Sequence, residues 1–188
     1  MLTLVIGGSC SGKSAFAESL VAKSHIDNRY YIATMEALDN ESKERVARHR
    51  ASRAHLGFTT LEYPRDIDRA ASQISANMPS IGLLECLSNL VAGEMFSKEA
   101  ELFLYGEKDV DANSYIAKLS DKIYEDAKAL SSSLDQLIIV SNNIFEDGNH
   151  YDKDTRLYMD VLALVNNRLL ELADTGYEVV AGIAVKLK

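Results

Sequence analysis

The chain has 188 residues, of which 47% are hydrophobic and 26% are charged, a composition typical of one globular domain with a substantial core. Its 28 acidic residues outnumber its 20 basic ones, and the formal net charge of -8 argues against a general nucleic-acid binder that depends on neutralising phosphates. No basic segment with a long apolar run follows Met1, so we expect neither a signal peptide nor a membrane span, and a cytoplasmic protein.

The chain opens with a β-prone run at residues 2–6, a glycine-rich loop, and a helical pattern at residues 13–24. The loop matches G-x-x-x-x-G-K-[ST] at Gly7, Gly12, Lys13 and Ser14, between a strand and a helix, as this motif requires. Glycines let backbone N–H groups point at phosphates, Lys13 reaches the outer phosphates, and the Ser14 hydroxyl can bind Mg²⁺. The loop is therefore predicted to bind a nucleoside triphosphate, and a plain strand-to-helix turn is the weaker alternative.

Residues 30–33 predict a second buried strand, and residues 41–56 predict a charged helix with few apolar positions. This helix holds the dense positive cluster ERVARHRASR, in which Arg45, His49 and Arg53 lie along one stripe, four residues apart. Arginines beside His49 disfavour its protonation, so a neutral imidazole could attack the α-phosphorus of a nucleotide and release pyrophosphate. A solvated basic face with an incidental histidine is the commoner arrangement for such a segment.

Residues 58–61 predict a third strand, and apolar residues spaced along 67–78 predict a helix that stops near Pro79. The next strand, at residues 81–84, leads directly into Glu85. This carboxylate is placed to be the second acidic ligand of a magnesium-bound triphosphate, or it simply marks the end of the strand. A short helix at residues 87–96 and a polar surface excursion at residues 97–113 follow.

The last third of the chain predicts an amphipathic helix at residues 115–130, a strand at 137–140, a loop at 142–154, a helix at 155–173 and a final strand pattern at 177–187. Strands that alternate with long helices predict parallel βαβ units, so the fold class is α/β, with a single domain over residues 1–188. Cys10 and Cys86 lack metal-ligand spacing and are expected to be small buried thiols. His25, His55 and His150 are expected to be surface or packed histidines.

Taken together, these motifs resemble the bifunctional adenosylcobinamide kinase/adenosylcobinamide-phosphate guanylyltransferase family of cobalamin biosynthesis. The resemblance runs from end to end and is carried by GGSCSGKS at residues 7–14, YIAT at 31–34, RVARHRASR at 45–53, TLE at 60–62, LLECLSNLV at 83–91, VSNN at 140–143, VNNRLLELAD at 165–174 and GIAVKLK at 182–188. It implies a P-loop NTPase fold with a RecA-like, mostly parallel sheet flanked by helices, assembled as a homotrimer.

The resemblance further implies a two-step enzyme. The terminal phosphoryl group of ATP or GTP passes to the hydroxyl on the aminopropanol arm of adenosylcobinamide. GTP then guanylylates His49, and the GMP moves to the phosphorylated corrinoid to give adenosylcobinamide-GDP. By matching position, His49 and Lys13 are catalytic, Ser14 and Glu85 hold Mg²⁺, and the nucleotide is contacted by Gly7, Gly8, Ser9, Cys10, Ser11, Gly12, Lys13, Ser14, Ala33, Thr34, Met35, Arg50, Ala51, Ser52, Arg53, Glu62 and Glu85.

Two departures from the family pattern bear on the second step. Asn143 stands where relatives commonly carry a glutamate, and residues 54–58 lack the usual proline and aromatic residue. A kinase with a weak or absent guanylyl transfer is therefore one alternative. A nucleotide-responsive binding module, in which the basic helix docks an acidic partner, is the alternative from a different class.

Overall fold

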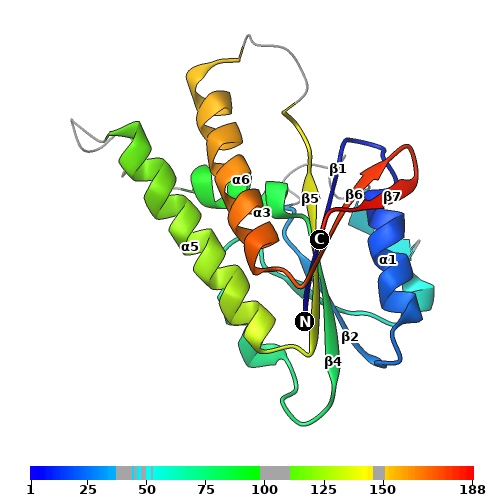
Figure 1. Ribbon diagram of the computed structural model, residues 1–188. Coiled ribbons are helices and arrows are strands. Elements are labelled where there is room, and N and C mark those ends of the chain that lie inside the picture. Colours follow the sequence, from blue (N-terminus) through cyan, green and yellow to red (C-terminus); the bar gives the residue numbers. More distant parts are fainter. Residues whose placement is uncertain (37–43, 45, 48–49, 52, 98–110, 146–150) are drawn as a thin grey trace.

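A seven-stranded sheet, with strand order β3-β2-β4-β5-β1-β6-β7, forms the centre of the molecule (Figure 1). The computed structural model describes residues 1–36, 44, 46–47, 50–51, 53–97, 111–145 and 151–188. Its strands are β1 (Leu2–Gly7), β2 (Asn28–Ala33), β3 (Thr59–Glu62), β4 (Ser80–Glu85), β5 (Gln136–Asn142), β6 (Thr175–Val180) and β7 (Ile183–Lys186). Neighbouring strands pair in parallel except β6 and β7, which are antiparallel. The predicted α/β class with a mostly parallel sheet is confirmed.

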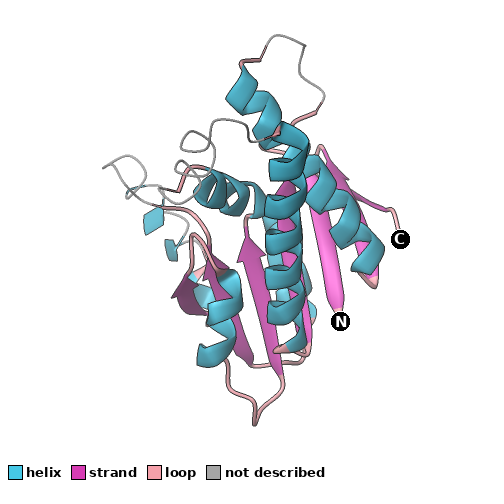
Figure 2. Ribbon diagram, turned by 90° about the vertical axis from the view of Figure 1, so that its left-hand side faces the viewer, coloured by secondary structure: helices cyan, strands magenta, loops and turns pink. Residues whose placement is uncertain are grey.

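Helices cover both faces of the sheet (Figures 1 and 2). One face carries α1 (Lys13–Lys23), and the other carries α3 (Leu87–Met95), α5 (Ala112–Ser132) and α6 (Lys153–Leu172). Because both faces are covered, the central strands are apolar on both sides, and Leu4 and Val5 of β1 are each fully buried in a different core cluster. No described helix is long and apolar enough to cross a membrane.

The predicted helix at residues 67–78 is wrong in length and type. The structure has a 3-10 helix, η2 (Ile67–Gln73), and the chain becomes extended at Ile74, with φ -88° and ψ 130°. The extended backbone lets Ile74 join the core, and the Ser75 N–H donates to the Tyr30 hydroxyl at 3.1 Å in place of a helical carbonyl. The apolar spacing was compatible with a helix, but tertiary contacts decided the conformation.

The predicted final strand is in fact a hairpin of two strands, β6 and β7. Its turn residues Ala181 and Gly182 have φ values of 48° and 83°. The mirror-image turns of tight hairpins need positive φ at such positions, which glycine adopts freely and alanine rarely does. The turn was missed because an alanine in an apolar run carries little turn signal.

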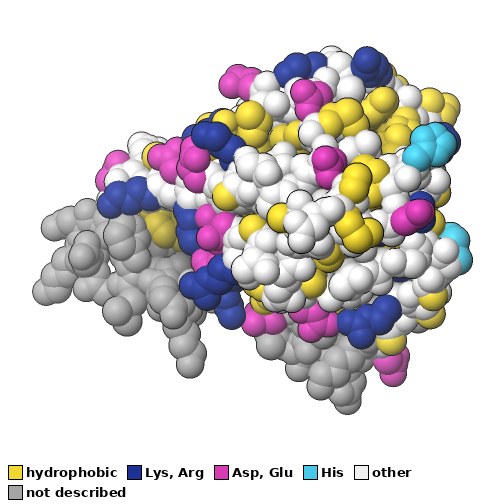
Figure 3. All heavy atoms as spheres, turned by 90° about the horizontal axis from the view of Figure 1, so that it is seen from below, with side chains coloured by type: hydrophobic (Ala, Val, Ile, Leu, Met, Phe, Trp, Pro, Cys, Tyr) yellow, Lys and Arg dark blue, Asp and Glu magenta, His cyan; other side chains and the backbone are white. Residues whose placement is uncertain are grey.

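The end of the sheet at which the parallel strands begin has no concentrated charge. Figure 3 shows this end, with acidic and basic side chains interspersed among hydrophobic and uncharged ones. The described part of this face therefore offers no positive patch for a polyanion.

Three acidic side chains from separate elements surround the ammonium group of Lys122 on α5. Its Nζ lies 2.9 Å from Asp66, 2.6 Å from Glu94 and 2.8 Å from Asp126. Burial lowers the pKa of Lys122, but hydrogen bonds to the three carboxylates outweigh burial and raise the pKa above its ordinary value. The three carboxylates are close enough to hold a metal ion, but Lys122 fills their centre. The cluster therefore joins η2, α3 and α5 electrostatically.

Replacing Lys122 with methionine should lower the free energy of unfolding by about 2 kcal/mol at neutral pH, because three carboxylates would lose their counter-ion. This value is below the cost of breaking a fully buried pair, since Lys122 and Asp66 are 39% and 37% exposed. This loss in the free energy of unfolding should become smaller as pH falls. Carboxylates without a counter-ion have raised pKa values in the folded state, so protonating them stabilises the folded variant. Denaturant unfolding between pH 4 and pH 8 measures both effects.

The matched control is Lys128→Met on the same helix. Lys128 pairs with Glu125 at 3.3 Å, and the two side chains are 51% and 60% exposed. This variant should change the free energy of unfolding by less than about 0.5 kcal/mol at any pH. An equal effect of the two substitutions would contradict a structural role for the Lys122 cluster.

Candidate active site

The loop between β1 and α1 is shaped by two of its glycines. Gly12 begins the helix with φ 93°, and a side chain at Gly7 would lie 2.5 Å from Ser11 Oγ and 2.7 Å from the Val179 carbonyl. Lys13 folds back over this loop and donates from Nζ to the Gly8 carbonyl at 3.1 Å. Ser11 Oγ is buried without a hydrogen-bond partner among the described residues. A loop with an unpaired hydroxyl, an ammonium group and a helix N-terminus suits a phosphate chain.

Two segments that follow neighbouring strands of β1 hold the loop by backbone hydrogen bonds. The Asn143 N–H, just after β5, donates to the Gly7 carbonyl at 2.9 Å, and the Gly182 N–H in the β6–β7 turn donates to the Ser11 carbonyl at 2.8 Å. Both contacts occupy carbonyls of the loop rather than its N–H groups, of which the Ser11 N–H donates to the Gly8 carbonyl at 3.2 Å. The loop is therefore held by segments that are distant in the sequence.

The carboxylate of Glu85 lies where β4 ends, beside the start of α1. Ser14 Oγ donates to Glu85 Oε1, and the Tyr31 hydroxyl donates to Glu85 Oε2 at 3.1 Å. Burial and the negative charge of Glu85 raise the pKa of Tyr31, so the phenol keeps its proton and remains a donor. The structure thus brings Ser14 and Glu85, the two predicted magnesium ligands, into direct contact.

Arg53 packs over Tyr31 rather than facing solvent. Its guanidinium carbon lies 3.5 Å from the centre of the Tyr31 ring, and the residue is only 5% exposed. A cation held over an aromatic ring at this depth is strongly oriented. Arg50, by contrast, is exposed and pairs with Glu62 at 2.7 Å, so this ion pair contributes little to stability. The solvated basic face considered from the sequence does not describe Arg53.

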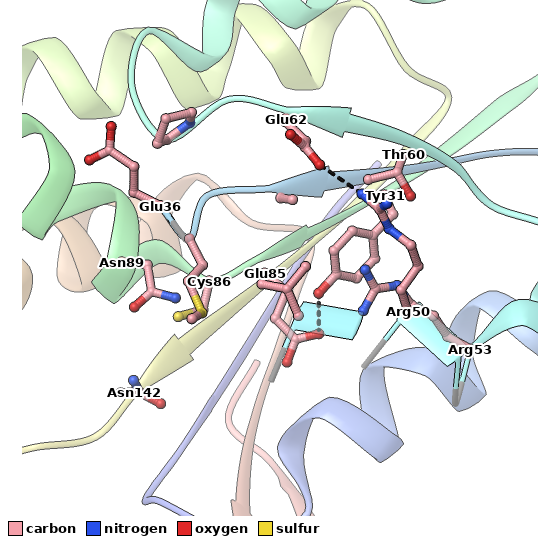
Figure 4. Close-up of a pocket in the computed structure, with 14 residues that line it drawn as sticks. Tyr31, Glu36, Arg50, Arg53, Thr60, Glu62, Glu85, Cys86, Asn89 and Asn142 are labelled. Atoms are coloured by element: carbon pink, nitrogen blue, oxygen red, sulfur yellow. Dashed lines mark hydrogen bonds and ion pairs between the residues drawn. The ribbon is translucent and has the colours of Figure 1, made fainter. Parts of the chain in front are cut away.

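A cavity of about 360 Å³ opens over the carboxyl ends of β2, β3 and β4 (Figure 4). Six predicted nucleotide contacts line it: Ala33, Met35, Arg50, Arg53, Glu62 and Glu85. In Figure 4, the guanidinium groups of Arg50 and Arg53 and the Tyr31 ring gather on one side, with Glu85 between them and Cys86. The cavity thus joins a positive wall to the carboxylate that touches the loop residue Ser14, an arrangement suited to a nucleotide.

The other predicted residues lie elsewhere. The side chain of Thr34 is 1% exposed and donates to the Cys86 carbonyl at 2.7 Å, so it faces the interior. Ala51 is exposed and does not line the cavity, while the loop residues Gly7, Gly8, Ser9, Cys10, Ser11, Gly12, Lys13 and Ser14 reach it through the contact between Ser14 and Glu85. Predicted residues Arg45, His49, Ser52 and His150 lie outside the described residues.

One prediction about the cysteines is wrong. Cys86 is buried as expected, but Cys10 is exposed, because it sits at a turn of the loop with φ 57°. The Cys86 thiol contacts Ser88 Oγ at 2.9 Å, and burial raises its pKa, so it stays protonated. Ser88 also accepts from Asn142 Nδ2 at 2.6 Å.

Eight residues that line the cavity were missed as site residues, and Tyr31, Asn89 and Asn142 are among them. Tyr31 and Asn142 end or nearly end parallel strands, where the polar groups of an α/β sheet meet its ligands. That position was the available signal, but the continuous apolar run at residues 30–33 made Tyr31 look like a core residue. Asn89 lies in the first turn of α3 and carried no comparable signal.

The chain is similar to known proteins along nearly its whole length. The family model described as cobinamide kinase / cobinamide phosphate guanyltransferase matches residues 3–187. The bifunctional adenosylcobalamin biosynthesis protein CobU of Salmonella typhimurium is 32% identical over 192 residues, with both chains covered completely. The corresponding protein CobP of Pseudomonas aeruginosa is 30% identical, covering 100% of this chain and 98% of CobP.

Among solved structures, an ATPase of a bacterial type III secretion system superposes with a TM-score of 0.51 at 12% identity, covering 98% of this chain and 56% of that one. This likeness concerns the fold alone. The family match spans nearly the whole sequence and includes the loop, the Glu85 strand end and the hairpin. The chain therefore belongs to the cobinamide kinase / cobinamide phosphate guanyltransferase family.

Proposed function

We propose that the protein phosphorylates adenosylcobinamide with ATP or GTP and then transfers GMP from GTP to the product, giving adenosylcobinamide-GDP. The contact between Ser14 and Glu85 carries this proposal, because it joins the phosphate-binding loop to the cavity lined by Arg50 and Arg53. A triphosphate held by the loop would keep its nucleoside end toward that cavity. Membership in the family supports both reaction steps.

For the phosphoryl step, Lys13 would leave the Gly8 carbonyl and bind the outer phosphates. The donors of Ser14 and Glu85 are a hydroxyl and a carboxylate, which are hard oxygen ligands of the kind that Mg²⁺ prefers. Bound there, Mg²⁺ would supply charge neutralisation at the phosphate oxygens. The neutral Tyr31 hydroxyl keeps the Glu85 carboxylate oriented toward Ser14.

For the guanylyl step, His49 would be the nucleophile. Its attack forms a bond from an imidazole nitrogen to the α-phosphorus, breaks the bond to the pyrophosphate oxygen, and releases pyrophosphate. Arg50 and Arg53 follow His49 in the same segment, and both line the cavity. Two guanidinium groups there can neutralise the charge that develops on the non-bridging oxygens.

The direct test is nucleotide consumption with and without the acceptor. With Mg²⁺ and GTP, the protein should turn over nucleotide only when adenosylcobinamide is added, and chromatography should separate a phosphorylated corrinoid from a GDP-linked one. Removing the metal with EDTA should stop both products, and restoring Mg²⁺ should recover them. Acceptor-independent hydrolysis with no corrinoid product would instead indicate a nucleotide-responsive binding module. A phosphorylated product alone would indicate a kinase.

Two further expectations accompany this function. Cells hold ATP and GTP in the cytoplasm, so we expect the enzyme to work there. The resemblance to the family also implies a homotrimer, which sedimentation analysis would detect. Both stay predictions.

A further inference from the structure

A second cavity, of about 350 Å³, shares no lining residue with the first. It is formed between α6 and the ends of β1, β5, β6 and β7, and its lining includes Asn143, Phe145, Asn166, Glu178 and Leu187. Phe145 and Leu187 are 40% and 48% exposed, so the opening has an apolar rim. The lining itself combines three asparagine amides with one carboxylate. Of these residues, only Asn143 contacts the phosphate-binding loop, through its backbone N–H.

The carboxylate in this cavity is held in one orientation. Asn143 Nδ2 donates to Glu178 Oε1 at 3.3 Å, and the other end of the same amide, Oδ1, accepts from the Phe145 N–H at 3.4 Å. The amide is therefore fixed by a contact at each end. Among the residues that the structure describes, the second oxygen of Glu178 has no hydrogen-bond partner, so it can accept one from a ligand.

Asn166 provides an independent sign of a ligand. It is 5% exposed, and neither its Nδ2 nor its Oδ1 has a hydrogen-bond partner in the described structure. A buried amide with no hydrogen bond at either end costs free energy, and such amides are rare in native proteins. A bound ligand would supply the missing hydrogen bonds. Because an amide offers one donor and one acceptor side, its best complement is another amide.

Glu178 also lies beside the phosphate-binding loop. It pairs in register with Ile6, and the next residue, Val179, has its carbonyl packed against Gly7. Asn143, which holds the Glu178 carboxylate, donates its own N–H to the Gly7 carbonyl at 2.9 Å. The residues that line the cavity therefore contact Gly7, where the loop begins, directly or through the adjacent residue Val179.

We propose that this cavity binds the hydroxyl-bearing arm of the acceptor, and that Glu178 accepts the hydroxyl proton. The inference rests on the proposed function, in which the acceptor is an alcohol joined by an amide to a larger ring. A volume of about 350 Å³ admits such an arm but not a corrin macrocycle, which stays outside at the apolar rim. Asn166 pairs with the amide of the arm.

Phosphoryl transfer to the acceptor replaces one phosphorus–oxygen bond with another. The acceptor oxygen forms a bond to the γ-phosphorus while the bond from that phosphorus to the bridging oxygen breaks, and the nucleoside diphosphate leaves. The hydroxyl proton passes to the free oxygen of Glu178 and then to water. No oxidant or further reactant is needed.

The first test is Glu178→Gln, which keeps the shape of the side chain but removes its basicity. We expect kcat for phosphorylation of adenosylcobinamide to fall by about 10² or more, while KM for GTP stays unchanged. Labelling of the protein by GTP in the absence of acceptor should proceed normally. The acidic limb of the pH profile should disappear. Glu171→Gln makes the same chemical change at an exposed position of α6 and should leave every parameter unaltered.

The second test is Asn166→Leu, which removes the amide at nearly constant volume. We expect KM for the acceptor to rise about tenfold with little change in kcat, because one amide pairing is lost from binding. Thermal stability should not fall, since an unpaired buried amide is removed. Ser120→Ala on α5 is the matched control, because Ser120 Oγ is also buried and unpaired but does not line the cavity.

These results distinguish a failure of the acceptor site from a failure of the proposed function. An active wild type whose Glu178→Gln variant keeps its rate and pH profile would overturn the role of Glu178. An unchanged acceptor KM in Asn166→Leu would overturn the assignment of the cavity. A wild type that makes no phosphorylated corrinoid would overturn the proposed function, and the acceptor site with it.

Discussion

Replacing Lys13 with alanine should abolish both transfer reactions, lowering each rate by about 10³ or more. Lys13 is the cation nearest to the bound phosphates in the proposed complex, and its Nζ already lies over the loop, 3.1 Å from the Gly8 carbonyl. Both steps develop negative charge on phosphate oxygens, so both lose the same stabilisation. Rates of phosphoryl transfer and of protein guanylylation, measured separately, check the prediction.

The matched control is Lys23→Ala at the other end of α1. Lys23 is exposed in the last turn of this helix, and its charge has no ion-pair partner among the described residues, which leaves the helix dipole. This variant should lose at most about 1 kcal/mol of stability and no activity. If the Lys13 variant kept either reaction at the wild-type rate, the loop would not hold the reacting phosphates in that step.

Replacing His49 with alanine should eliminate the covalent GMP adduct while leaving phosphorylation of adenosylcobinamide intact. The prediction follows from the sequence, in which His49 precedes Arg50 and Arg53, and from the cavity that these two arginines line. No other group in the proposed mechanism can form the phosphoramidate, so the loss should be complete rather than partial. Phosphoryl transfer does not pass through His49 and should keep its rate.

Mass spectrometry of the intact protein after exposure to GTP measures this adduct. The wild type should gain the mass of one GMP, in a linkage that is labile to acid and stable to base. His55→Ala is the control, because His55 is an exposed histidine in η1 (Ala54–Leu56), one turn beyond the same segment. An adduct that persists in the His49 variant would place the nucleophile elsewhere.

Much of the fold could be predicted because parallel strands buried on both faces are continuous apolar runs. The sequences of β1 and β5 show this pattern. The loop between β1 and α1 could be predicted from its G-x-x-x-x-G-K-[ST] motif. The prediction failed where a conformation depends on contacts made elsewhere. Ile74 leaves the helical region to reach the core, and Ala181 adopts positive φ because the two strands that it joins pair with each other.

The same distinction applies to the site. Ser14 and Glu85 could be predicted as partners, because strand ends of an α/β sheet meet at one edge. The depth of Arg53 and the hydrogen bond between Tyr31 and Glu85 could not, since they depend on how residues 53–58 pack over β2. Glu178 carried no signal at all, because its neighbour Asn143 is close only in space.

The contact of the Gly182 N–H with the Ser11 carbonyl has a consequence for how the protein is made. A ribosome synthesises the loop long before the hairpin, so the loop lacks this hydrogen bond until β6 and β7 have been made. Gly12 and Gly182 approach so closely that a β-carbon at Gly12 would lie 3.3 Å from Gly182 Cα, so the loop and the hairpin turn pack directly against each other. The loop should therefore become able to hold a nucleotide only when β6 and β7 dock against it.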